Sequence, residues 1–154
     1  MTRTLLIVGH VPSPNTQRLR DAVEAGARGL GADGVSVRCL TPFEAGPADV
    51  LGAQAIVLGT TENLGYMSGA LKDFFDRTYY GVLEERQGLP CALYIRAGLD
   101  GTGTRRAVES ILTGLRWKLV ADPLTFKGDW QETFVEQAGE LGQLMAAGLE
   151  AGVF

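Results

Sequence analysis

Short apolar runs alternate along the chain with longer segments in which apolar residues recur every three or four positions. The runs at residues 4–9, 55–59 and 91–97 are continuous, which is typical of strands covered on both faces of a parallel sheet. Residues 35–39 alternate like a more exposed strand, and residues 119–124 predict a weaker fifth strand. The hydrophobic pattern therefore predicts five strands.

Four segments between and after these runs carry one apolar stripe each, which predicts amphipathic helices. They cover residues 16–29, 68–80, 104–115 and 131–149. The positions expected to face inward are Leu19, Ala22, Val23 and Ala27; Leu71, Phe74, Phe75 and Thr78; Ala107, Val108, Ile111, Leu112 and Leu115; and Phe134, Ala138, Leu141, Leu144 and Met145. Residues 41–53, with two prolines and two glycines, are expected to form a connector with one short turn.

Repeated strand and helix units with short connections predict one α/β domain over residues 1–154. Right-handed crossovers favour a three-layer, doubly wound, five-stranded parallel sheet with strand order 2-1-3-4-5. In such sheets the ligand crevice lies beyond the carboxyl ends of the strands, where the order reverses. The loops that follow Gly9, Gly59 and Ala97 are therefore the candidate binding loops.

The charge of the chain is a net −4 with a pI near 5.0, and no run of Lys or Arg occurs. This balance disfavours nucleic acid and anionic membranes as partners. The apolar run after Met1 is too short for a signal sequence or a membrane span, so we expect a cytoplasmic protein. Cys39 and Cys91 lack the spacing of a metal site or a disulfide framework and are expected to be buried strand thiols. Glycine, at 21 of 154 residues, is about twice as common as the usual ~7%.

The first candidate loop leads from Gly9 into a helix through Ser13, Asn15 and Thr16. A helix N-terminus presents free N–H groups and partial positive charge, so this loop could bind an anion with neutral donors. The plainer alternative is that Asn15 and Thr16 only cap the helix. His10 is expected to be a donor of this loop or a crevice wall rather than a proton shuttle.

The second loop, residues 59–69, holds Leu64, Tyr66 and Met67 where exposure is expected, which suits a flat aromatic ligand. Its structural alternative is a helix capped by Ser68 with Leu64 as a hydrophobic staple. The third loop, residues 97–104, has three glycines that permit close backbone approach, with N–H groups free for ring carbonyls. Taken alone, it could also be a flexible loop.

Two segments of the sequence resemble those of a known protein family. Residues 13–19, Ser-Pro-Asn-Thr-Gln-Arg-Leu, are similar to the phosphate loop of flavodoxin-like FMN proteins. Residues 59–74, which begin Gly-Thr and end Gly-Tyr-Met-Ser-Gly-Ala-Leu-Lys-Asp-Phe, resemble the flavin-ring loop of the NAD(P)H:quinone oxidoreductase and NADPH-dependent FMN reductase branch. The chain departs from that pattern at Thr61 and Glu62, and at His10, where a Ser or Thr is usual.

The resemblance implies an FMN-binding oxidoreductase that uses NADPH or NADH to reduce a quinone or another small aromatic acceptor. Such a flavin performs the redox chemistry at its own N5, so no catalytic side chain and no metal are expected. A homodimer is expected from the same branch. The residues assigned to the cofactor are His10, Ser13, Asn15, Thr16, Thr60, Thr61, Glu62, Asn63, Leu64, Gly65, Tyr66, Ala97, Gly98, Leu99 and Gly103. A Glu62 carboxylate beside the ring would lower the flavin potential.

Two other classes of function remain open from the sequence. A flavodoxin-type electron carrier would bind FMN without oxidising NAD(P)H, and a flavodoxin-like binding module would bind no flavin. A Rossmann-type dinucleotide-binding protein is disfavoured because no G-x-G-x-x-G follows the first strand. A low-molecular-weight phosphatase is disfavoured because no Cys-x5-Arg stands at the end of that strand.

Overall fold

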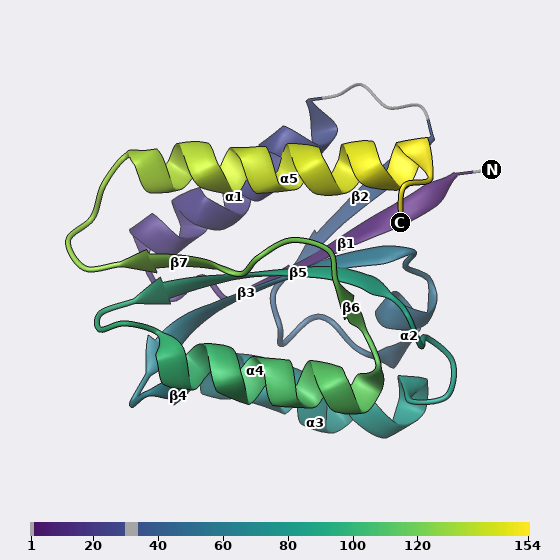
Figure 1. The fold of residues 1–154 in the computed structure, drawn as a ribbon, viewed down its shortest axis with the longest axis horizontal. Helices are drawn as coiled ribbons and strands as arrows, with labels where there is room; N and C mark the ends of the chain where they lie inside the picture. The colour runs from purple at the N-terminus through teal and green to yellow at the C-terminus, as the bar shows by residue number, and fades with distance from the viewer. Residues whose placement is uncertain (1, 30–33) are drawn as a thin grey trace.

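The computed structural model describes residues 2–29 and 34–154, which form a parallel sheet between two layers of helices (Figure 1). Helices α1 and α5 cover one face, and α3 and α4 cover the other. The elements in chain order are β1 (Arg3–Gly9), α1 (Pro14–Arg28), β2 (Val35–Leu40), α2 (Pro47–Leu51), β3 (Ala55–Asn63), β4 (Tyr66–Met67), α3 (Gly69–Val82), β5 (Pro90–Ala97), α4 (Thr102–Leu115), β6 (Lys118–Leu119), β7 (Leu124–Lys127) and α5 (Thr133–Ala151).

The described sheet has seven strands rather than the predicted five. Its main path is β2-β1-β3-β5-β6, with β7 also paired to β5 and β4 paired antiparallel to β3. The predicted order of the parallel strands is confirmed, because β2, β1, β3 and β5 occupy the expected places and β6 and β7 share the fifth. The strand count was wrong at the hairpin β3–β4 and at the fifth strand.

The predicted fifth strand is divided into β6 and β7 because it has more residues than the part of β5 with which it pairs. From Leu119 to Leu124 the chain advances five residues, while their partners on β5, Cys91 and Tyr94, are three residues apart. The surplus residues lie between Leu119 and Leu124, outside the ladder, and end at Pro123, which has no N–H to donate to a neighbouring strand.

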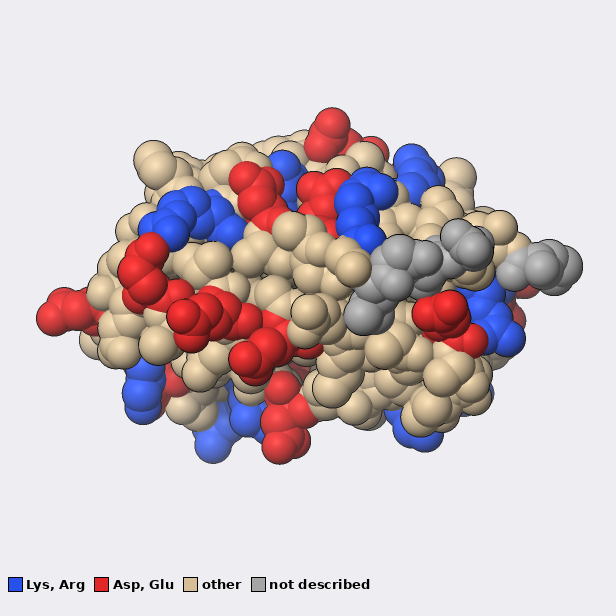
Figure 2. Space-filling model, turned by 90° about the horizontal axis from the view of Figure 1, so that it is seen from above, with Lys and Arg blue, Asp and Glu red and all other residues tan. Residues whose placement is uncertain are grey.

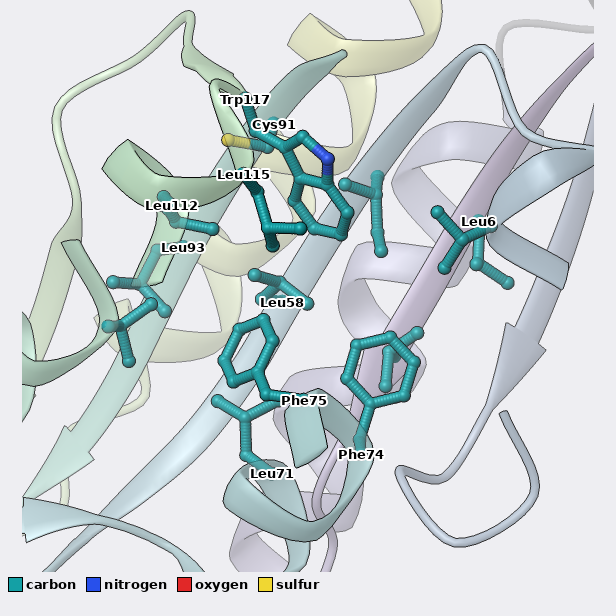
Figure 3. Close-up of a cluster of buried hydrophobic side chains, with 14 of the residues drawn as sticks. Leu6, Leu58, Leu71, Phe74, Phe75, Cys91, Leu93, Leu112, Leu115 and Trp117 are labelled. Carbon is teal, nitrogen blue, oxygen red and sulfur yellow. The ribbon is translucent and has the colours of Figure 1, made fainter. Parts of the chain in front are cut away.

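Both faces of the sheet are buried, as the continuous apolar runs predicted. On one face, Leu6 and Leu58 pack with Phe74 and Phe75 of α3 and with Leu112 of α4 (Figure 3). On the other, Leu5, Ile7 and Val57 pack against α1 and α5. The predicted helical stripes are largely confirmed, although Leu144, expected inside, is 46% exposed.

Part of the glycine excess is explained by the contact between α1 and α5. A Cβ on Gly26 would lie 2.0 Å from the carbonyl oxygen of Gly139, and a Cβ on Gly142 would lie 2.0 Å from that of Val23. The two helices therefore touch backbone to backbone, and any side chain at these positions would separate them. These glycines build the layer that carries the first candidate loop.

Candidate functional site

The three candidate loops lie together at one edge of the sheet. Strands β1, β3 and β5 are parallel neighbours, so their carboxyl ends and the loops that follow meet at that edge, on the left of Figure 1. The backbone N–H of His10 donates to the carbonyl of Gly59 at 3.0 Å, which joins the first two loops directly. We call this region, formed by residues 10–16, 60–68 and 97–103, the carboxyl rim.

The first loop ends in a full helix cap. The Ser13 hydroxyl accepts a hydrogen bond from the Thr16 N–H at 3.2 Å, and the Thr16 hydroxyl accepts one from the Ser13 N–H at 3.0 Å. Thr16 is almost fully buried and Asn15 is half-buried. The helix begins at Pro14, two residues before the predicted start. The structure therefore shows the helix cap, and the binding of an anion by this loop stays a prediction.

The second loop is a β-hairpin, which the sequence analysis did not anticipate. Strand β3 continues to Asn63, and the turn consists of Leu64 and Gly65 with φ values of +54° and +74°. Positive φ at both central residues defines the tight hairpin turn that normally uses Asn-Gly. Leu64 is unusual there, and the missing Asn is why the turn was not predicted. Leu64 is fully exposed, so it does not act as a hydrophobic staple.

Two threonines and a serine support this hairpin from within. The buried Thr60 hydroxyl accepts the Ser68 N–H at 3.0 Å, and the Ser68 hydroxyl caps α3 by accepting the Leu71 N–H at 3.1 Å. The Thr61 hydroxyl donates to the Asn63 side chain at 2.8 Å. The Ser68 cap was part of the structural alternative for this loop. Thr60 holds the base of the hairpin, and its assignment to the cofactor stays a prediction.

Glu62 joins the second loop to the third. Its carboxylate accepts hydrogen bonds from the backbone N–H of Leu99 at 2.7 Å and of Gly101 at 2.9 Å. The expectation that the N–H groups of the third loop are free for a ring therefore fails for these two, because a carboxylate already occupies both. The sequence could not show this pairing, since Glu62 and the third loop are more than 35 residues apart.

The N-terminus of α4 packs tightly on the hairpin. A Cβ on Gly103 would lie 2.1 Å from the carbonyl oxygen of Gly65, and the Thr104 hydroxyl donates to the carbonyl of Tyr66 at 2.9 Å. Gly65 and Gly103, both assigned to the cofactor, thus contact one another. Gly98 differs, because the place of its missing Cβ has no atom within 4 Å.

Exposed apolar side chains border the carboxyl rim on both sides. Leu64 and Tyr66 of the hairpin and Leu99 of the third loop are exposed, and Ala97 below them is buried. His10 meets Phe43 edge-on at 6.3 Å between ring centroids, and burial lowers the pKa of His10 from its usual value of 6.5. At neutral pH this edge therefore offers an uncharged imidazole and apolar side chains.

Beneath the rim lies a residue that sequence reasoning missed. The ring of Tyr94, on β5, crosses the sheet over two glycines: a Cβ on Gly59 would lie 2.1 Å from the ring, and one on Gly9 would lie 2.7 Å from its hydroxyl oxygen. Tyr94 is buried, its hydroxyl has no hydrogen-bond partner within the described residues, and burial raises its pKa above the usual value. Glycine at the end of β1 and in the middle of β3 is the signal that could have suggested a bulky neighbour.

Trp130 precedes α5 and belongs to a packed cluster beside the rim. The guanidinium groups of Arg18 and Arg96 lie 5.6 and 5.7 Å from the indole centroid. Glu132 accepts hydrogen bonds from Arg18 and then from the indole N–H, and together they lower its pKa to about 2.

The cysteines lie on strands as predicted, with Cys91 buried and Cys39 half-buried. Burial raises the pKa of Cys39 to about 11 and that of Cys91 to about 12, so both are neutral thiols at pH 7.

Among residues 2–29 and 34–154, no three His, Cys, Asp or Glu side chains are grouped to bind a metal. Within the same residues, no helix has the length and apolar character needed to cross a membrane. The face of α1 and α5 carries interspersed acidic and basic side chains (Figure 2).

Solved structures of known proteins share this fold. The fold is similar to that of a flavodoxin from the domain Archaea, with a TM-score of 0.80, 19% identity, and 96% of this chain and 99% of that one covered. Flavodoxin 1 from Bacillus cereus gives a TM-score of 0.74 at 17% identity over 90% of this chain and 94% of that one. The chain has a flavodoxin-like fold.

The sequence is also similar to that of a flavodoxin. The chain is 32% identical over 111 residues to a flavodoxin from Aquifex aeolicus, and the match covers 72% of this chain and 59% of the relative. An oxidoreductase from Corynebacterium diphtheriae also shares the flavodoxin-like fold, with a TM-score of 0.69 at 16% identity over 95% of this chain and 96% of that one. No family model matches the sequence.

Proposed function

We propose that this flavodoxin-like chain binds FMN at the carboxyl rim and serves as an electron carrier. The observation that carries the proposal is the convergence of the capped α1 N-terminus, the β3–β4 hairpin and the third loop at one edge of a flavodoxin-like sheet. The similarity to the flavodoxin from Aquifex aeolicus supports it and favours a carrier over the reductase expected from the sequence.

The residues present at the rim fit FMN in their chemistry. Pro14 has no N–H and the Ser13 hydroxyl already accepts that of Thr16, so the N-terminus of α1 would offer a phosphate chiefly its partial positive charge. Leu64, Tyr66 and Leu99 offer exposed apolar surface on the two loops that would flank a flat ring. The open space at Gly98 allows a ligand to approach the backbone there.

The protein's part in such chemistry is to bind, orient and tune the cofactor. Bound FMN would supply the redox-active ring, so no acid or base of the chain has to move a proton. Glu62 holds the third loop against the hairpin through the backbone N–H groups of Leu99 and Gly101. Thr60 and Ser68 hold the hairpin on the opposite side.

The absorption spectrum of the purified protein tests this proposal first. We expect a flavin spectrum, or one that develops when FMN is added to colourless protein, with one FMN bound per chain. Bound FMN should also raise the unfolding free energy, by about 2.7 kcal/mol at 100 times the dissociation constant. A protein that stays colourless and gains no stability from FMN would instead be a binding module without flavin.

A second candidate function is the NAD(P)H-dependent reductase expected from residues 59–74. The fold similarity to the Corynebacterium diphtheriae oxidoreductase supports this alternative at the level of the fold. Anaerobic titration of the FMN-loaded protein with NADPH and with NADH separates the two. A carrier keeps its flavin colour with both nucleotides and loses it with dithionite, whereas a reductase is bleached by one of the nucleotides.

A further inference from the structure

Arg20 follows an unusual path beneath the first loop. It lies on the inner side of α1, and its aliphatic stem crosses the last residue of β1. A Cβ on Gly9 would lie 2.9 Å from both Cγ and Cδ of Arg20. Because Gly9 immediately precedes the loop, the side chain is held against the base of the first candidate loop.

The polar atoms at this point lack partners. The Arg20 Nε is buried without a hydrogen bond, and so is the hydroxyl of Tyr94, which lies 2.7 Å from the same Cβ position on Gly9. The terminal nitrogens of Arg20 are not among the buried unpartnered atoms of the described chain. The stem is therefore fixed inside the protein while the end of the guanidinium group remains open to a ligand.

The charge of Arg20 is also uncompensated at short range. The other two arginines of α1 are paired: Arg18 with Glu132 at 2.6 Å and Arg28 with Glu24 at 2.8 Å. Arg20 takes part in none of the six ion pairs found among the described residues. Hydrogen bonding to Thr41 lowers the pKa of Glu44, and the positive charge of Arg20 adds to this effect. The Glu44 carboxylate already accepts the Thr41 N–H at 2.8 Å.

We propose that Arg20 supplies the positive charge that binds the phosphate group of FMN, and that it makes the carboxyl rim select phosphorylated over unphosphorylated flavin. This inference rests on the proposed function. The sequence suggested a phosphate site built only of neutral donors, because the loop itself contains no Lys or Arg. The fold brings Arg20 back to the base of that loop from the second turn of the helix.

A guanidinium group suits this task because it stays charged and presents several N–H donors in one plane to phosphate oxygens. Its fixed stem reduces the conformational entropy lost when the ligand binds. Riboflavin has the same ring as FMN without the phosphate, so the affinity ratio of the two ligands measures the contribution of the charge.

The test is a fluorescence titration of the apoprotein with FMN and with riboflavin. Arg20→Gln should weaken FMN binding roughly 10- to 100-fold and leave riboflavin binding unchanged. Arg20→Lys, which keeps the charge, should retain part of the preference for FMN. Arg116→Gln is the matched control, because it removes the same charge from the exposed end of α4 at the opposite edge of the sheet.

Riboflavin binding reports whether each variant keeps a folded rim. If Arg20→Gln does not fold, the wild-type protein supplies a second measurement: added salt should weaken FMN binding more than riboflavin binding, because only FMN is held by charge. The inference is overturned if Arg20→Gln binds FMN as tightly as the wild type, or if salt affects both ligands equally. Failure of the wild type to bind FMN at all would instead refute the proposed function.

Discussion

The carboxylate of Glu62 is hydrogen-bonded to the backbone N–H of Leu99, 37 residues away in sequence, and the same carboxylate accepts the N–H of Gly101. This bridge determines how far the hairpin and the third loop stand apart. It also means that the loop is ordered by the protein itself rather than by a ligand alone.

Replacing Glu62 should loosen the third loop. In Glu62→Ala two backbone N–H groups lose a charged acceptor, so we expect the unfolding free energy to fall by about 1–2 kcal/mol, given ~1.5–3 kcal/mol for a hydrogen bond to a charged group and the partial exposure of this one. Amide hydrogen exchange at Leu99 and Gly101 should accelerate. Glu140→Gln, on the exposed side of α5, is the control and should change neither quantity. Unchanged exchange at both amides would show that the bridge does not persist in solution.

Gly59 should not tolerate a side chain. A Cβ there would lie 2.1 Å from the ring of Tyr94, which is buried and cannot move without disturbing the sheet. We expect Gly59→Ala to lower the unfolding free energy by about 1–3 kcal/mol, measured by urea denaturation. Gly46→Ala, where a Cβ meets no atom within 4 Å, is the matched control. Equal effects of the two substitutions would contradict the packing of Tyr94 across β3.

The turn of the hairpin can be improved. Leu64 has a φ of +54° and is fully exposed, so it bears backbone strain without contributing to packing. Leu64→Asn should stabilise the protein by about 1 kcal/mol, because Asn adopts this conformation more readily. Leu99→Asn, at an exposed position without positive φ, controls for the loss of a surface leucine. Stabilisation by both substitutions alike would mean that exposure, not strain, is the cause.

His10 is the single histidine of the chain, so its titration is directly visible by NMR. Burial lowers its pKa below 6.5, which means that the unfolded chain binds a proton more readily than the folded one. The stability contributed by neutral His10 is therefore fully present above pH 6.5 and is lost as the pH falls through the lowered pKa. His10→Gln should weaken this part of the pH dependence of unfolding. A measured pKa at or above 6.5 would contradict the burial of the imidazole.

The sequence predicted the order of the parallel strands because their apolar runs are continuous, and it predicted the helices because their stripes are regular. It did not predict the β3–β4 hairpin, because Leu64 takes a backbone conformation that its type rarely adopts. The division of the fifth strand was missed because the surplus residues before Leu124 are visible only against β5.

The candidate site was predicted at the level of its loops rather than its contacts. The chain order places residues 10–16, 60–68 and 97–103 at one edge, and periodicity is enough to show this. The pairings of Glu62 with Leu99, of Gly65 with Gly103, and of Arg20 with Gly9 join residues from different elements or loops. Such contacts depend on side-chain reach and backbone geometry, which a single sequence does not display.

The most direct test of the account is the change in backbone amide NMR shifts when FMN is added to the protein. We expect large changes confined to the carboxyl rim, at residues 10–16, 60–68 and 97–103. We expect none at the opposite edge, where a cavity of about 460 Å³ is lined by Arg3, Gln54 and Glu150 among others. Shifts centred on that cavity, or no shifts at all, would contradict it.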